Sequence, residues 1–191
     1  MAEIDEHLDR ISNLPDPILS LILSFLPTKQ AVASIVLSKR WQGIWTEVPA
    51  LDLDVINLSN ESNSTFVDRV LILNVAPFLH QFKLSCCLTK TIKEFHICSW
   101  IMNAIRRDIF EMDLSFDIAY SGRPMLLPAM ILVCEKLKVL KLKSWTLPLT
   151  PLVHLPSLVA LHLDHISFVD ESTLEYLLSR LPCLEEVTSC D

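Results

Sequence analysis

The stretch NLPDPILSLILSFLPTKQAVASIVLSKRWQGIW, residues 13–45, decides how the chain begins to fold. The sequence PDP at 15–17 predicts the start of a helix, because its aspartate can cap and a proline at the first helical position loses only an N–H without a partner. Pro27 ends this helix, and Thr28 and Ser38 are placed to cap a second and a third. Apolar residues lie on both sides of the first helix, and a unit shorter than ~40 residues seldom folds alone. We therefore expect either a partner protein or the rest of a larger domain to cover it.

Several phrases in this stretch resemble the F-box of plant proteins that also carry leucine-rich repeats. They are the Leu-Pro at 14–15, LPTK at 26–29 and LSKRW at 37–41. The resemblance places an F-box at residues 10–50 and implies that its helices dock onto the Skp adaptor, which connects to a cullin scaffold. By the same resemblance, the adaptor contacts are Leu14, Pro15, Ile18, Leu19, Ile22, Val36, Leu37, Lys39 and Trp41.

The chain after a linker expected at residues 51–65 repeats one leucine pattern, L-x-x-L-x-L. The matches are Leu79-Phe82-Leu84, Ile109-Met112-Leu114, Leu137-Leu140-Leu142, Leu158-Leu161-Leu163 and an imperfect Leu184-Val187-Ser189. They begin 30, 28, 21 and 26 residues apart, near the roughly 20 to 29 residues of leucine-rich repeats, whose units stack into one core. Unrelated strands of an α/β domain remain the alternative.

The segments between these matches carry helix or turn signals. Short helices are expected at 66–74, at 100–105, at 128–134 and at 174–181, whereas prolines at 148, 151 and 156 predict a non-helical return. The predicted fold class is α/β: a three-helix F-box followed by a short, irregular leucine-rich-repeat solenoid with a parallel sheet. About four to five degenerate repeats fill residues 66–191. The resembling plant proteins typically continue through further repeats and often an FBD-type domain, so we expect a C-terminal part to be lacking and the last repeat to be uncovered.

Alternation along the predicted strands points to a binding surface. If the leucines of the template turn into the core, the residues between them must point the other way. This predicts a substrate-facing surface, or alternatively an ordinary solvated sheet face. Its residues are Glu111, Asp113, Lys141, Lys143, His162, Asp164 and Glu186.

Composition argues against several function classes. A net charge of −7 without clustered Lys and Arg disfavours nucleic-acid binding. No apolar run reaches the ~20 residues of a spanning helix, and the acidic start MAEIDEHLDR does not resemble a secretory signal. We therefore expect no membrane association and an intracellular location, in the nucleus, the cytoplasm or both.

Motifs for catalysis, cofactors or metals are also missing. The six cysteines form no C-x-x-C pair, and the two glycines make no phosphate-binding loop. His162 and His165 stand three residues apart, so on a strand they would point to opposite faces and form a poor metal site. We expect no enzyme activity, no cofactor and no metal.

Together these expectations describe a substrate-receptor subunit of an SCF-type ubiquitin ligase. The F-box would bind the Skp adaptor, and the repeats would bind a target protein that the sequence does not identify. One alternative is a truncated adaptor-binding protein that occupies the adaptor without delivering a substrate, and another is an enzyme built on an irregular α/β domain.

Overall fold

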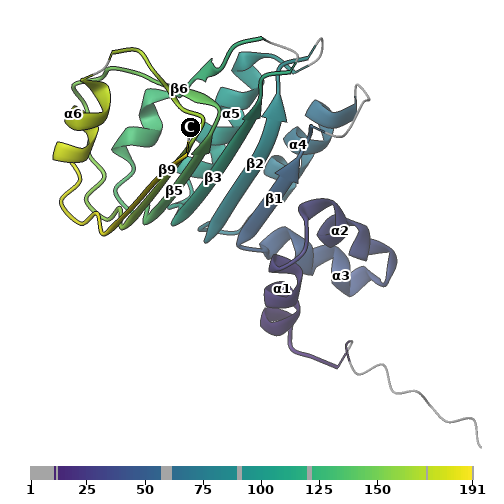
Figure 1. Ribbon diagram of the computed structural model, residues 1–191. Coiled ribbons are helices and arrows are strands. Elements are labelled where there is room, and N and C mark those ends of the chain that lie inside the picture. Colours follow the sequence, from purple (N-terminus) through teal and green to yellow (C-terminus); the bar gives the residue numbers. More distant parts are fainter. Residues whose placement is uncertain are drawn as a thin grey trace, which may run out of the picture.

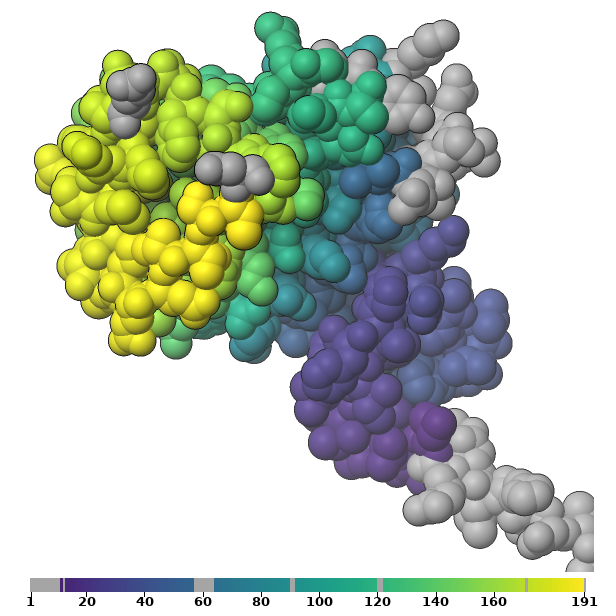
Figure 2. Space-filling view, in the orientation of Figure 1, coloured from purple at the N-terminus to yellow at the C-terminus, as the bar shows by residue number. Residues whose placement is uncertain are grey.

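A computed structural model describes residues 11, 13–56, 62–89, 92–119, 122–170 and 172–190. Its N-terminal part is a lobe of short helices: α1 (Asp16–Ser24), α2 (Thr28–Ala33), η1 (Ser34–Val36), α3 (Lys39–Ile44) and η2 (Trp45–Glu47). Figure 1 shows this lobe at one end of a sheet, and Figure 2 shows it as a distinct bulge of the surface.

The predicted helix starts are right, but two of the three predicted caps are not. Pro15 and Pro27 occupy the N-cap positions of α1 and α2, so Asp16 and Thr28 already lie inside the helices. Ser38 is the N-cap residue of α3, without a side-chain hydrogen bond to the helix. The two freed side chains make longer-range contacts instead, which the sequence spacing alone could not reveal.

The larger part of the chain is built around a parallel sheet in which each new strand is added beside the last. The strands, in spatial order, are β1 (Ala50–Asp54), β2 (Gln81–Cys87), β3 (Glu111–Asp117), β5 (Val139–Lys143), β7 (Ala160–Asp164) and β9 (Glu186–Cys190). A second parallel sheet contains β4 (Met125–Leu126), β6 (Trp145–Leu147) and β8 (Ser167–Phe168). The repeated connection in one direction is that of a solenoid, which confirms the predicted fold class.

Helices connect successive strands and cover one face of the main sheet (Figure 1). They are α4 (Ser62–Leu73), α5 (Glu94–Ile105), η3 (Ala129–Val133) and α6 (Thr173–Ser179). The return between β6 and β7, which contains the three prolines, has no helix, as predicted. The helices leave the opposite face of the sheet uncovered, and this is called the outer face below.

The core lies between the sheet and these helices. The leucine positions of the template point into it and stack in register across the strands. One buried row is Leu51, Phe82, Met112, Leu140 and Leu161, and the next is Leu53, Leu84, Leu114, Leu142 and Leu163. On the helix side, Val67, Ile97 and Trp100 belong to the same core cluster. Each strand therefore adds a layer to one continuous core.

One repeat was missed from the sequence. Val48, Leu51 and Leu53 fit the same template, and β1 carries them into the sheet in register with β2. The expected linker at 51–65 therefore includes most of β1 and, from Ser62, the first turn of α4. Residues 57–61 of that range lie outside the described residues, as do residues 10 and 12 of the expected F-box and residues 90, 91, 120, 121, 171 and 191 of the expected repeats.

Hydrogen bonds join the helical lobe directly to the first repeat. The N–H of Asp52 donates to Oγ1 of the buried Thr28 at 2.8 Å. The side-chain amide of Asn74 donates to the carbonyl of Val48 at 3.0 Å, and the N–H of Val75 donates to the carbonyl of Thr46 at 2.7 Å. The lobe and the sheet therefore meet at a bonded seam.

Candidate functional site: two protein-binding surfaces

The helical lobe exposes apolar side chains along one side of α1. Ile18, Leu21, Ile22 and Phe25 follow each other at helical spacing, and all four are exposed; Phe25 retains 80% of its accessible surface. We call these four residues the α1 stripe. The opposite side of α1 carries the buried Leu19 and Leu23. Contiguous rows of large apolar side chains are unfavourable in water and often mark protein-binding sites, so the stripe is a candidate binding surface.

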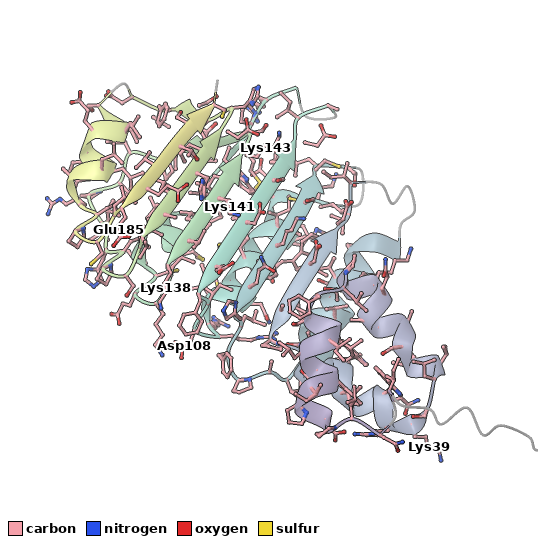
Figure 3. All side chains as sticks on the ribbon, turned by 60° about the horizontal axis from the view of Figure 1, so that its bottom comes forward. Lys39, Asp108, Lys138, Lys141, Lys143 and Glu185 are labelled. Carbon is pink, nitrogen blue, oxygen red and sulfur yellow. The ribbon has the colours of Figure 1, made fainter. Side chains whose placement is uncertain are left out.

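Three further apolar side chains are exposed on the turn between α2 and α3. They are Ile35, Val36 and Leu37, and Val36 is 83% exposed. Lys39 begins α3 immediately after this turn and is also exposed. Figure 3 shows its side chain pointing away from the lobe.

The structure sorts the nine expected adaptor contacts into three groups. Six are exposed: Pro15, Ile18, Ile22, Val36, Leu37 and Lys39. Leu14 is partly buried and packs against the core. Leu19 and Trp41 are buried in the core of the chain alone, so they present little surface to a partner, and their role as adaptor contacts stays a prediction. They hold the helices together beneath the exposed surface.

Sequence reasoning left Leu21, Phe25 and Ile35 out of the expected contacts. The signal for Leu21 and Phe25 was present, because both make the second side of α1 apolar. A helix that is apolar all round gives no indication of which side turns inward. The packing of α1 against α3 settles the choice, and there Arg40 donates to Oδ1 of Asp16 from Nε at 2.7 Å.

The second candidate surface is the outer face of the main sheet. Strand register places charged and polar residues of neighbouring strands side by side in a row: Asp52, Lys83, Asp113, Lys141, His162 and Thr188. A parallel row contains Asp54, Ser85, Ser115, Lys143, Asp164 and Cys190. All seven residues expected to face a substrate share this face, and Figure 3 shows Lys141 and Lys143 on it.

Several of these charges already have partners within the chain. Lys143 Nζ lies 2.6 Å from Oδ2 of Asp164, whose Oδ1 lies 2.5 Å from Nδ1 of His165. Hydrogen bonds from Lys143 and His165 lower the pKa of the Asp164 carboxyl, and the same bond with Asp164 raises the pKa of Lys143. Closer to β9, Nδ1 of His162 lies 2.6 Å from Oγ1 of Thr188.

Asp113 differs from the other carboxylates of this face because it is half-buried. Loss of solvent raises the pKa of its carboxyl, and the nearby Lys83 and Lys141 partly counteract that shift. Asp113 borders a hollow of about 290 Å³ over β3, β5, β7 and β9, whose polar walls include Ser115, Lys141 and Thr188. The hollow offers both charge signs to a bound group.

Neither surface has the features of a catalytic or metal centre. Among the described residues, no group of three or more His, Cys, Asp or Glu side chains could hold a metal ion. Cys86 is fully buried, and desolvation raises the pKa of its thiol, which disfavours the reactive thiolate. No helix in the described part of the chain is both long and apolar enough to cross a membrane.

Comparison with known proteins agrees with this division into two parts. The F-box domain family matches residues 11–51, and the family described as FBD-associated F-box protein At5g56370, LRR repeats, matches residues 97–190. The chain belongs to the F-box proteins with leucine-rich repeats. The helical lobe is therefore the F-box, and the sheet with its helices is the repeat region.

Curated relatives from Arabidopsis thaliana match along almost the whole chain. F-box/LRR-repeat protein 13 is 38% identical over 191 residues, which cover 98% of this chain and 42% of that protein. FBD-associated F-box protein At5g56370 is 38% identical over 93% of this chain and 42% of its own length. Putative F-box/LRR-repeat protein At4g15060 is 35% identical over 95% and 44%. The chain spans less than half of each of these relatives, and no solved structure matches it significantly.

Proposed function

We propose that this F-box protein is a substrate-receptor subunit of an SCF-type ubiquitin ligase. The F-box binds a Skp adaptor, and through it a cullin, while the outer face of the repeats holds a target protein. The observation that carries the proposal is the α1 stripe, because the F-box fold leaves these apolar side chains in water when the chain is alone. The proposed location is intracellular, in the nucleus, the cytoplasm or both.

Its mechanism is proximity rather than chemistry by its own residues. A target held on the outer face shares one scaffold with a ubiquitin-charged conjugating enzyme. This raises the effective concentration of the target's lysines near the thioester and converts an encounter between separate molecules into a step within one assembly. The chain itself needs no catalytic group for this function.

Co-expression with a Skp-type adaptor tests the first half of the proposal. Ile22→Asp should abolish co-purification, because it buries an unpaired charge in the contact. Ile72→Asp is the matched control, since Ile72 is 76% exposed on α4, outside the F-box, and should retain the adaptor. Equal recovery of the adaptor with both variants would contradict the assigned surface.

A second candidate function is occupation of the adaptor without delivery of a target. The outer face gives some support to it, because Lys143 is already paired with Asp164 and His162 is engaged with Thr188, so these groups offer less to a target. A reconstituted ligase separates the candidates. Both predict a stable adaptor complex, but only the receptor predicts ubiquitination of proteins that co-purify with the chain.

A further inference from the structure

Opposite charges that form no hydrogen bond or ion pair among the described residues lie side by side on the outer face between β3 and β5. Glu111 and Asp113 lie on β3, and Lys141 lies on β5 in register with Asp113. Within the described part of the chain, the side chains of these three residues make no hydrogen bond and no ion pair. They are therefore available to groups from another molecule.

The neighbouring charges of the same face are engaged. On one side, Lys83 Nζ lies 3.8 Å from Oδ2 of Asp52, and on the other side Lys143 is paired with Asp164. His162 is engaged with Thr188. The boundary between β3 and β5 is therefore a patch that carries both negative and positive charge. The charged residues on either side of it are already paired within the chain.

The shape of the patch adds to this charge pattern. The hollow of about 290 Å³ begins at Asp113 and extends past Lys141, so a side chain placed there contacts Lys141 from above the sheet. Glu111 lies two residues before Asp113 on the same face of β3 and is not among the residues that line the hollow. A cation above Glu111 and Asp113 would also offset the desolvation that the half-buried Asp113 carboxylate already experiences.

We infer that the boundary between β3 and β5 binds an extended segment of the target protein that presents a basic and an acidic side chain on the same side. The basic group lies against Glu111 and Asp113, and the acidic group enters the hollow at Lys141. The inference rests on the proposed function, because it assigns the chemistry of the target that the outer face holds.

The spacing of an extended chain suits this arrangement. Side chains two residues apart in an extended segment lie on the same side, roughly 6.6 Å apart, and neighbouring strands of the sheet are about 4.8 Å apart. A segment that crosses the strands obliquely can therefore reach both charge signs. A purely basic segment meets repulsion from Lys141 and Lys143, and a purely acidic one meets repulsion from Glu111 and Asp113, so the mixed segment is preferred.

Fluorescent twelve-residue peptides provide the test, with the adaptor complex of the full chain as the binding partner. One pair of peptides carries Arg and Glu two residues apart, in either order, in a Gly/Ser background. The other two carry Arg and Arg or Glu and Glu at the same positions. At low salt, anisotropy titrations should show the mixed peptides binding about two- to tenfold more tightly than either like-charged peptide, as expected for exposed ion pairs.

Charge changes in the protein should alter this ranking in a defined way. Asp113→Lys makes the boundary basic and should favour the Glu/Glu peptide, whereas Lys141→Asp makes it acidic and should favour the Arg/Arg peptide. The double variant restores both signs and should restore the preference for mixed peptides. If the Asp113→Lys variant does not fold, Asp113→Asn takes its place. This substitution keeps the shape of the side chain but removes its charge, and it should weaken binding of the mixed peptides. Lys136→Asp makes the same charge change as Lys141→Asp in the connection before β5, where Lys136 pairs with Asp108, and should leave the ranking unchanged.

Three results would overturn the inference. One is failure of all four peptides to bind, and another is a ranking that Asp113→Lys and Lys141→Asp do not alter. The third is a dimer of the chain that Asp113→Lys dissociates, because a two-signed face can also pair with a second copy of itself. Adaptor recovery, measured on the same preparations, reports separately on the proposed function, since none of these substitutions lies in the F-box.

Discussion

Replacement of Phe25 by alanine separates a binding role of the α1 stripe from a folding role. Full burial of a phenylalanine side chain contributes about 1.5–3 kcal/mol. Phe25 keeps 80% of its surface in water in the chain alone, so about four-fifths of that free energy, roughly 1.2–2.4 kcal/mol, is available only on binding. The expected result of Phe25→Ala is a loss of adaptor affinity of roughly 7- to 50-fold.

The same arithmetic predicts a small effect on folding. About one-fifth of the burial free energy, less than roughly 0.6 kcal/mol, is already used in the folded chain. For a chain of this size, that corresponds to a fall in Tm of no more than about 2 °C. Isothermal titration with purified adaptor and thermal unfolding of the same preparation measure the two quantities. Ile72→Ala is the control, because Ile72 is similarly exposed outside the F-box and should change neither.

Two outcomes would refute this reasoning. An affinity within twofold of the unaltered chain, at unchanged Tm, would show that the end of α1 lies outside the adaptor contact. A fall in Tm of several degrees would show that Phe25 supports folding, so that any loss of affinity could not be assigned to the surface.

Three further predictions concern the seam, the outer face and the last strand. Thr28→Val removes the acceptor of the Asp52 N–H and should cost about 1–3 kcal/mol of stability, or roughly 2–12 °C in Tm, with Thr28→Ser as the control that keeps it. Because burial raises the pKa of Asp113, the folded chain binds this proton more tightly than the unfolded chain. The stability contribution of Asp113 is therefore present below its ordinary pKa of 3.8 and is lost as the pH rises through the pKa of the folded chain. In urea titrations, Asp113→Asn should stabilise the chain at pH 7 but not below pH 3.8. In hydrogen exchange of this chain, amides of β9, whose side chains are all exposed, should exchange faster than those of β7, which has strands on both sides; equal protection in a verified monomer would contradict this.

The repeats were predictable because one pattern determines both their local and their long-range structure. The leucines at 140, 142, 161 and 163 alternate with polar residues, and the same alternation that makes each strand also aligns it with its neighbour. The outer-face residues could therefore be named from the sequence. β1 was not predicted, because Val48 occupies the first leucine position of its repeat and a polar stretch follows the strand. The second sheet was not predicted, because strands of two or three residues are too short to show alternation of apolar and polar residues.

Features that depend on packing between distant elements could not be predicted. The burial of Leu19 and Trp41 depends on which side of α1 packs against α3. The sequence does not indicate that side, because α1 is apolar on both sides. The bond between Thr28 and Asp52 joins residues 24 apart, across the F-box and the sheet. The altered pKa of Asp113 arises from burial beside charges on two neighbouring strands. Each of these needs the docked structure, because local spacing contains no information about it.

The bonded seam determines how the two proposed surfaces are presented to each other. β1 starts three residues after η2 ends, and it is held by the hydrogen bond between Asp52 and Thr28 and by the buried Asn74. These bonds tie the first repeat to the F-box, which favours one direction of the outer face relative to the α1 stripe. A flexible linker would spread a bound target over many positions and dilute its effective concentration at the conjugating enzyme, whereas a fixed joint restricts it to few. For a receptor that acts by proximity, the seam is as important as either surface, because orientation limits the lysines within reach.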